Sequence, residues 1–364
     1  MKHISLLIKP ASSLCGYRCH YCFYEDVAAN RAVKSCGIMQ MDTVHAMLAA
    51  LFAKKPRAVS FVFQGGEPLL AGRPVFEGFT AAVAVYNTDR AAVQYSIQTN
   101  GALVDPAFCD FFARHRFLVG LSLDGTKELH DLHRVDAQGE GTFSATMQAA
   151  RLLKKSGVDF NILTVVTNEN ARYADKIYRF YRAQGFDHMQ FIPCMDAFDG
   201  GREWLSPERM GAFLKKLYDC WMADIAKGHP AYIRQFENYL QRLCGHPAED
   251  CSMNGRCGLY YVVEADGSLY PCDFYCLDAY RLGSVFDEDP FALSERHRQF
   301  LEESYQQAER CKTCRYLALC NGGCRRDRET ADHLNRYCGA YYTFFEHAYD
   351  GLCRLAAALR QMPR

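Results

Sequence analysis

Short apolar segments alternate with longer segments of helical periodicity along much of the chain. Branched and aromatic residues form six runs with the length of buried strands, at 4–8, 58–63, 93–97, 117–123, 158–166 and 188–192. Between these runs, apolar residues recur every three or four positions, as on one face of a helix, at 41–54, 74–86, 106–114, 142–156 and 171–184. Such alternation indicates parallel βαβ units and therefore an α/β fold.

Polar residues gather where the predicted strands end. They form the stretches 15–22, 64–68, 98–100, 122–124, 167–168 and 193–194. A partial (β/α)6 barrel of the TIM type, open at one side, brings the carboxyl ends of its strands to one face, where such barrels carry their active sites. We expect this architecture, although periodicity does not distinguish it from a doubly wound open sheet.

The chain changes character after two further predicted helices, at 206–226 and 232–243. From Cys251 onward it is rich in cysteine and glycine, with a hairpin signal at 265–267, and a last helix is predicted over 341–359. The expected domains are a partial barrel over 1–235, a small cysteine-rich domain over 236–340 and a C-terminal helix within 341–364.

Charge and hydropathy limit the partners that we expect. The 42 Lys and Arg residues balance 42 Asp and Glu residues, which leaves no electrostatic signature of nucleic-acid or anionic-membrane binding. The beginning of the chain lacks the pattern of a signal peptide, and no apolar run has the length of a membrane span. We therefore expect a cytoplasmic protein with no nucleic-acid or membrane partner.

Eighteen cysteines are many for such a protein, and because disulfides are rare in the cytosol, metal ligation is favoured. Cys15, Cys19 and Cys22 have the spacing C-x3-C-x2-C. A closed zinc site needs four ligands, whereas three thiolates on one loop suit three corners of a [4Fe–4S] cluster whose fourth iron is open to a small molecule. A partial zinc site or scattered buried cysteines is the alternative.

This spacing resembles the signature of the radical S-adenosylmethionine (SAM) enzymes, and Gln64-Gly-Gly-Glu-Pro68 resembles their GGE motif. The resemblance implies that the open iron binds the amino and carboxylate groups of SAM, and that the reduced cluster cleaves SAM to a 5′-deoxyadenosyl radical. The implied SAM contacts are Tyr21, Gly66, Ser122, Arg134 and Met195. From the residues alone, Glu67 either supports its turn or accepts from an ammonium group, and Arg134 could equally be a solvated surface residue.

Eight cysteines in the C-terminal part fall into metal-like spacings: Cys251, Cys257, Cys272, Cys311, Cys314, Cys320, Cys324 and Cys338. They suffice for two four-thiolate sites, and two zinc ribbons would use the same C-x2-C pairs. The pattern resembles the SPASM domain, which implies two auxiliary [4Fe–4S] clusters without an open iron, suited to electron transfer. The implied ligand sets are Cys251, Cys257, Cys272 and Cys324 for one cluster, and Cys311, Cys314, Cys320 and Cys338 for the other.

Asp273 follows directly on Cys272, in the string CDFY. A carboxylate can serve there as a general base, or merely cap a turn. The string CDFY, together with SMNGRC, VVEADGSLYP, SLLIKPASS, FVFQGGEP and NGGCRRDR, resembles the anaerobic sulfatase-maturating enzymes, and this resemblance covers nearly the whole chain.

The resemblance to sulfatase-maturating enzymes implies oxidation of a cysteine or serine to Cα-formylglycine. The target would lie in a sulfatase segment with the motif C-x-P-x-R or S-x-P-x-R. The implied route is abstraction of a Cβ hydrogen atom by the radical, with Asp273 as the base and an auxiliary cluster as electron acceptor. The implied cofactors are three [4Fe–4S] clusters and SAM, with an electron donor such as ferredoxin or flavodoxin. The alternatives are another SPASM enzyme that modifies peptides, for example by forming thioether crosslinks, or a zinc-ribbon binding protein.

Overall fold

The computed structural model describes residues 3–361. Residue contacts divide the chain into two compact units. The first unit comprises the chain up to Leu123, His130–Asn161 and Leu259–Arg298; the second comprises 124–129, 162–258 and the chain from Gln299 onward. No helix within the described residues is both long enough and apolar enough to cross a membrane.

Four parallel strands form the centre of the first unit. They are β1 (His3–Ile8), β2 (Ala58–Phe63), β3 (Ala92–Thr99) and β4 (Phe117–Ser122), in this spatial order. In the register of the sheet, Leu6 lies opposite Phe61, and Phe61 lies opposite Tyr95. Because Leu6 and Phe61 are fully buried, apolar side chains from neighbouring strands form a continuous core.

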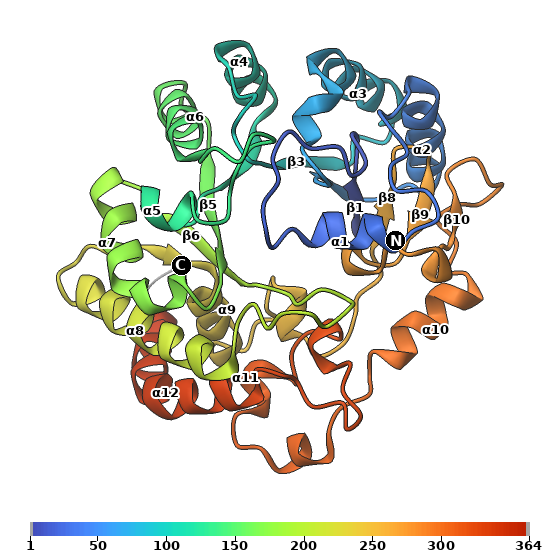
Figure 1. Cartoon of the computed structure of the whole chain (residues 1–364). Coiled ribbons are helices and arrows are strands. Elements are labelled where there is room, and N and C mark those ends of the chain that lie inside the picture. Colours follow the sequence, from blue (N-terminus) through green and yellow to red (C-terminus); the bar gives the residue numbers. More distant parts are fainter. Residues whose placement is uncertain (1–2, 362–364) are drawn as a thin grey trace. The chain divides into compact units, whose positions relative to one another are not determined.

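Strands from the cysteine-rich part of the chain extend this same sheet. Strand β8 (Tyr261–Val263) pairs parallel with β1, and β9 (Ser268–Tyr270) returns antiparallel to β8. Strand β10 (Gly283–Ser284) adds a last antiparallel edge, as Figure 1 shows. At the predicted hairpin Gly267 has φ +85°, and a Cβ there would lie 2.6 Å from Val285. The pairing of β1 with β8 therefore brings the region before Asp273 beside the N-terminal strand.

Helices of the first unit pack against its sheet through apolar stripes. In α2 the buried residues include Val44, Met47, Leu48 and Leu51, at helical spacing. The helices are α1 (Phe23–Ala29), α2 (Met41–Ala53), α3 (Arg73–Tyr86), α4 (Pro106–His115) and α6 (Phe143–Lys155). The elements that include residues of both units are α5 (Lys127–His130), β5 (Phe160–Val166) and α10 (Glu295–Glu303).

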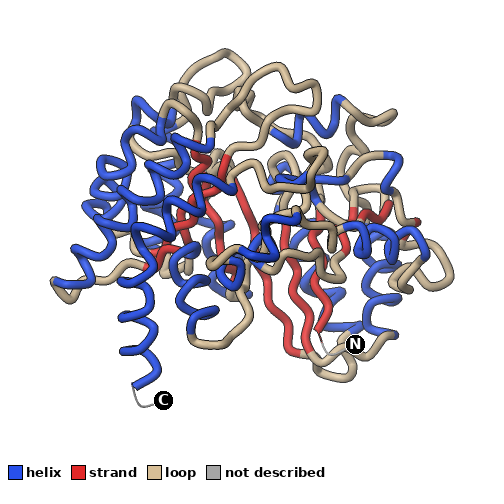
Figure 2. The backbone as a smooth tube through the Cα atoms, turned by 90° about the horizontal axis from the view of Figure 1, so that it is seen from below, coloured by secondary structure: helices blue, strands red, loops and turns tan. Residues whose placement is uncertain are grey.

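The second unit has a short parallel sheet and a bundle of long helices. Strand β6 (His188–Pro193) pairs with β5 and with β7 (Tyr232–Ile233). The helices are α7 (Ala174–Gln184), α8 (Pro207–Ala226), α9 (Arg234–Leu243), α11 (Leu317–Cys320) and α12 (Cys338–Gln361). Helix α12 packs on α8 and α9, and Figure 2 shows it running to the C-terminal end. Phe236 and Phe344 stack at this contact, with ring centroids 5.7 Å apart.

Short 3₁₀ helices connect these elements. They are η1 (Pro68–Ala71), η2 (Asn170–Tyr173), η3 (Cys251–Met253), η4 (Asp273–Tyr275), η5 (Asp278–Tyr280), η6 (Glu309–Thr313) and η7 (Arg326–Arg328). Of the eight cysteines singled out in the C-terminal part, Cys251 and Cys311 lie in these short helices, and Cys272 and Cys314 lie directly next to them.

The predicted α/β fold with parallel strands and a C-terminal helix is confirmed. Several bounds differ from those predicted. Strand β3 continues through Gln98 and Thr99, residues 232–233 are a strand and not the start of a helix, and the last helix begins at Cys338 instead of Tyr341. Helices α1 and α10 were not predicted, because neither has a long apolar period.

Candidate active site

Cys15, Cys19 and Cys22 lie on the loop between β1 and α1, and all three are partly accessible to solvent. The backbone N–H of Cys22 donates to the carbonyl of Cys19 at 3.1 Å, which closes the second half of the loop into a turn. The side-chain amide of Asn100 lies 3.7 Å from the sulfur of Cys15, and burial raises the pKa of this thiol to about 11. Within residues 3–361, no three His, Cys, Asp or Glu side chains are grouped tightly enough to hold a single metal ion.

The segment 133–136 runs antiparallel to the cysteine loop. The backbone N–H groups of Arg18 and His20 donate to carbonyls of this segment at 2.7 and 3.0 Å. The Arg134 guanidinium lies 5.5 Å from the centroid of the Tyr21 ring, and both residues are buried. Two of the predicted SAM contacts are thus neighbours, and they carry a cation beside the three thiols.

The Gly65-Gly66 turn after β2 packs directly on the backbone that leads into Cys15. Gly66 donates its N–H to the Ser12 carbonyl at 2.9 Å. A Cβ on Gly66 would lie 2.1 Å from the Leu14 carbonyl oxygen, so no other residue fits without displacing the loop.

The Glu67 carboxylate is fully engaged by the chain itself. Its oxygens accept from the Thr99 hydroxyl at 2.8 Å, the Asn100 backbone N–H at 2.8 Å and the Leu69 backbone N–H at 3.1 Å. Burial raises its pKa to about 7, and these donors act in the opposite direction. Of the two roles considered for Glu67, the structure supports the first, because the side chain ties together the ends of β2 and β3.

The other two predicted SAM contacts lie in different units. Ser122 is the last residue of β4, in the same unit as Tyr21, Gly66 and Arg134. Met195 belongs to the second unit, in the loop that follows β6.

Asp273 lies in η4, which packs against α1, the helix that follows the cysteine loop. The Tyr24 hydroxyl donates to Asp273 Oδ2 at 2.6 Å and also lies 3.0 Å from Gln64 Oε1. Asp273 Oδ1 is shielded from solvent and has no hydrogen-bond partner within the described part of the chain. Burial raises the pKa of this carboxyl, against the Lys9 charge and the Tyr24 hydrogen bond. A buried carboxylate oxygen without a donor is costly, and it is suited to accept a proton from a bound molecule.

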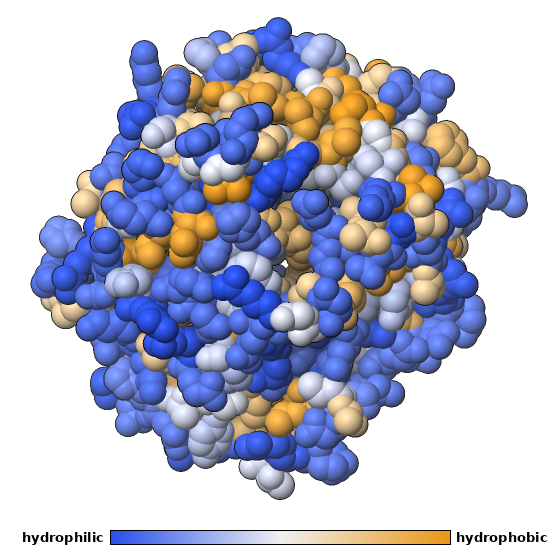
Figure 3. All heavy atoms as spheres, viewed as in Figure 1, coloured by the Kyte–Doolittle hydropathy of each residue, from blue (hydrophilic) through white to orange (hydrophobic). Residues whose placement is uncertain are grey.

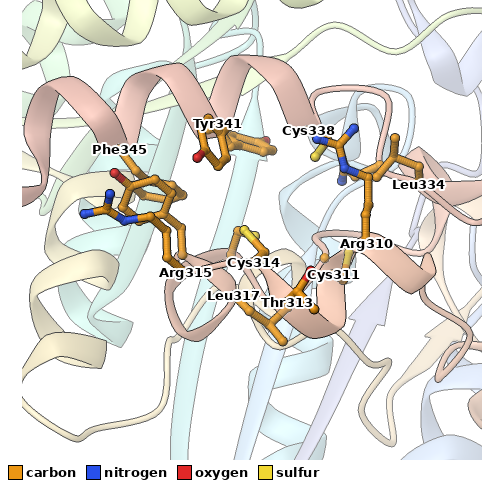
Figure 4. A pocket seen from close by; sticks show the side chains of 15 residues that line it. Arg310, Cys311, Thr313, Cys314, Arg315, Leu317, Leu334, Cys338, Tyr341 and Phe345 are labelled. Atoms are coloured by element: carbon orange, nitrogen blue, oxygen red, sulfur yellow. The ribbon is translucent and has the colours of Figure 1, made fainter.

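Four cysteines of the second unit line one cavity of about 320 Å³: Cys311, Cys314, Cys320 and Cys338. Figure 4 shows three of them, from the segment around η6 and from the first turn of α12, with Arg310 and Arg315 at the edges. The charges of Cys311, Cys314 and Cys338 act on the pKa of Cys320, which burial raises to about 11. These four thiols therefore form one set.

Cys251, Cys257 and Cys324 form a second set in the same unit. Burial raises the pKa of Cys324 well above its usual value, and the charges of Cys251 and Cys257 add to this shift. Buried Arg328 ties the surrounding backbone together by donating to the carbonyls of Cys324 at 3.4 Å, Gly255 at 3.1 Å and Ser304 at 2.8 Å. Cys272, the fourth ligand implied for this set, belongs to the first unit.

Comparison with known proteins identifies the family. The profile of the Radical SAM superfamily matches residues 10–181. The cysteine-type anaerobic sulfatase-maturating enzyme of Clostridium perfringens is 42% identical over 98% of this chain and 99% of its own length. The chain belongs to the anaerobic sulfatase-maturating enzymes of the radical SAM superfamily.

A serine-type enzyme and a solved structure with bound molecules are also similar to this chain. The serine-type anaerobic sulfatase-maturating enzyme of Klebsiella aerogenes is 34% identical, over 93% of this chain and 84% of its own. A solved structure of native anSMEcpe with bound AdoMet and the Cp18Cys peptide superimposes with a TM-score of 0.93 at 40% identity, covering 98% of this chain and 99% of the other. Membership in the superfamily implies a [4Fe–4S] cluster and SAM, and it excludes the alternative of a zinc-ribbon binding protein.

The sequence of this sulfatase-maturating enzyme did not single out every residue around Asp273. It did not predict that Tyr24, Gln64 and Lys9 would lie around this carboxylate. The available signals were weak, namely an aromatic residue two positions after Cys22, the polar residue that starts the GGE turn, and a lysine directly after a buried strand. Cys276 is fully buried with its sulfur 3.7 Å from the Cys272 carbonyl, as expected for an inert core thiol.

Proposed function

We propose that this enzyme oxidises a cysteine, or a serine, of a sulfatase polypeptide to Cα-formylglycine. The observation that carries the proposal is the shielded, unpartnered Oδ1 of Asp273, in the same unit as the loop of Cys15, Cys19 and Cys22. In combination with family membership, it provides a base beside a radical site. A sulfatase substrate is supported by the related enzymes of Clostridium perfringens and Klebsiella aerogenes, which are sulfatase-maturating enzymes.

The residues at the N-terminal site fit the cofactors that the family implies. Cys15, Cys19 and Cys22 would hold a [4Fe–4S] cluster on one loop, which leaves one iron for SAM. Tyr21, Gly66, Ser122, Arg134 and Met195 would contact SAM. When bound, the cluster and SAM would supply radical chemistry for removing a hydrogen atom from Cβ of the target residue. Arg134 offers the charge that a methionine carboxylate needs.

The thiols of the C-terminal part fit two further clusters. The cavity lined by Cys311, Cys314, Cys320 and Cys338 has the donor set of a fully ligated [4Fe–4S] cluster. Cys251, Cys257 and Cys324 would hold the other with Cys272. Such clusters supply an acceptor for the second electron of the oxidation, and a ferredoxin or flavodoxin would serve as external electron donor.

Asp273 and Tyr24 would act on the proton of the target thiol or hydroxyl. The Tyr24 hydroxyl occupies Oδ2, so the proton is taken at Oδ1. Because carboxylate, phenol and amide belong to one hydrogen-bonded group, the orientation of Oδ1 is fixed before substrate binds.

The substrate segment would be an extended peptide with the motif C-x-P-x-R or S-x-P-x-R. Three leucines near Glu67 are each about two-fifths exposed: Leu14 before the first cysteine, Leu70 in η1 and Leu103 in the loop after β3. Figure 3 shows separate hydrophobic patches on the otherwise hydrophilic face that Figure 1 presents. Exposed leucines on loops next to the cysteines suit the apolar side chains of an unfolded polypeptide.

Mass spectrometry of an anaerobic assay tests the proposal. Reconstituted enzyme, a reductant and SAM are incubated with two peptides that differ only in cysteine or serine at the target position. We expect formylglycine in the cysteine peptide together with 5′-deoxyadenosine. Formation of 5′-deoxyadenosine with both peptides unmodified would overturn the substrate and favour another peptide modification, such as a thioether crosslink.

A further inference from the structure

A buried group of charges lies beside Asp273, and the reaction proposed above does not use it. Lys9 is 1% exposed and Glu264 is fully buried, and the Lys9 ammonium lies 3.3 Å from Glu264 Oε2. Arg31 Nη1 lies 2.5 Å from the same oxygen, and its side chain is 3% exposed. Burying a charged side chain is costly unless an opposite charge or a hydrogen bond compensates it. We therefore ask which partner compensates each of these three side chains.

Arg31 alone is a sufficient partner for Glu264. It makes the shorter of the two contacts with Glu264 Oε2, and its guanidinium also lies 5.5 Å from the centroid of the Tyr270 ring. The Ala265 backbone N–H donates to the other oxygen of Glu264 at 3.2 Å. The second cation, Lys9, is therefore in excess of what Glu264 requires.

The Lys9 ammonium also faces the Tyr24–Asp273 pair. It lies 5.3 Å from the centroid of the Tyr24 ring, and its charge acts on Asp273. The backbone of Lys9 is fixed at the end of the sheet. Its N–H donates to the Val263 carbonyl at 2.9 Å, at the position where β1 and β8 both end. The group as a whole contains two cations, Lys9 and Arg31, and two carboxylates, Glu264 and Asp273.

We propose that Lys9 is a positioning residue for the base. Its ammonium holds the Tyr24 ring by a cation–π contact and compensates the charge of the Asp273 carboxylate. The Tyr24 hydroxyl therefore keeps its hydrogen bond to Oδ2 of Asp273, and Oδ1 stays available to accept the substrate proton. This inference rests on the proposed function, since it assigns Lys9 to the proton-transfer step. Lys9 does not touch the substrate, and it acts through Tyr24 and Asp273.

The test separates radical formation from product formation. In Lys9→Met, SAM cleavage should continue while formylglycine formed per 5′-deoxyadenosine falls on the order of tenfold. The loss should appear in kcat and not in the KM for the peptide, because Lys9 makes no contact with the substrate. Arg31→Met is the matched control, since it removes the other cation of Glu264 and leaves Lys9 beside Tyr24; its product ratio should equal that of the wild type.

The double variant Lys9→Met/Glu264→Gln distinguishes two roles of Lys9: positioning Tyr24 and Asp273, or only compensating the charge of Glu264. It removes one charge of each sign, so Arg31 and Asp273 remain as one cation and one carboxylate, and the buried group keeps its net charge. Continued uncoupling in the double variant supports the inference. Recovery of the wild-type ratio would overturn it, because Lys9 would then serve only Glu264.

Wild-type enzyme in the same experiment distinguishes the two proposals. If it forms no formylglycine from either peptide, the proposed function fails. If it forms formylglycine and Lys9→Met is equally well coupled, the role of Lys9 fails while the proposed function stands. Iron content and the absorption spectrum of each variant verify that the clusters are equally loaded.

Discussion

The hydroxyl of Tyr24 donates to Oδ2 of Asp273 at 2.6 Å, although 249 positions separate the two residues in the chain. Tyr24 follows the cysteine loop, and Asp273 follows one of the proposed auxiliary ligands. A single hydrogen bond therefore joins the two parts of the chain that the proposed reaction uses. It also selects which oxygen of Asp273 stays free.

Asp273→Asn should separate SAM cleavage from oxidation. An amide retains the shape and a hydrogen bond to Tyr24 but does not accept the substrate proton, so formylglycine should fall about 100-fold or more. Liquid chromatography with mass spectrometry of 5′-deoxyadenosine and peptide provides both quantities in one sample. Formylglycine at the wild-type rate, with iron content unchanged, would show that another group is the base.

Gly66→Ala should prevent assembly of the cysteine loop. The new Cβ would lie 2.1 Å from the Leu14 carbonyl oxygen. Displacement of this backbone should lower the free energy of unfolding by about 3 kcal/mol. Gly16→Ala is the matched control, because a Cβ at Gly16 has nothing within 4 Å. We expect loss of SAM binding and of the N-terminal cluster in Gly66→Ala alone, measured by iron content and equilibrium binding of SAM. Equal behaviour of the two variants would refute the steric argument.

Iron counting should resolve the two sets of thiols in the second unit. Cys311→Ala/Cys314→Ala and Cys251→Ala/Cys257→Ala should each lose about four iron atoms per chain after anaerobic reconstitution. Cys220→Ala/Cys353→Ala, which changes two cysteines outside both sets, should lose none. Zinc in place of iron, or loss from both sites in each variant, would contradict the assignment.

His297 should make the folded state sensitive to acid. The imidazole is fully buried against Tyr261, with neither ring nitrogen hydrogen-bonded, and burial lowers its pKa from 6.5 to about 4. Because the folded-state pKa is the lower one, its contribution to stability is fully present above about pH 6.5 and is lost as the pH falls toward about 4. Between about pH 7.5 and pH 5.5 the loss should be roughly 1 kcal/mol.

The corresponding variant is His297→Phe. Anaerobic melting temperatures across this pH range should fall less for His297→Phe than for the wild type. Replacing the exposed His246 in the same way should leave the pH dependence unchanged. Parallel curves for wild type and His297→Phe would exclude the imidazole as the source.

The sequence predicted strands β1 to β6, most of the helices and the cysteine loop well, because local periodicity and spacing determine them. Strand β2, for example, has the predicted bounds. The group around Asp273 was not predictable in this way. Lys9 and Tyr24 meet Asp273 only because β8 pairs with β1, and the pattern of apolar residues in a strand does not specify its neighbour. For the same reason the role of Glu67 became clear only when Thr99 and Asn100 were seen to donate to it.

The position of β8 has a consequence for biosynthesis. Strand β1 is covered on both edges only after residues 261–263 have left the ribosome. Until then the apolar residues Leu6, Leu7 and Ile8 lie on an open strand edge, which is a template for pairing with other chains. The nascent protein therefore needs β8, or a chaperone, to protect β1, and Tyr24 meets Asp273 only after β8 has paired with β1.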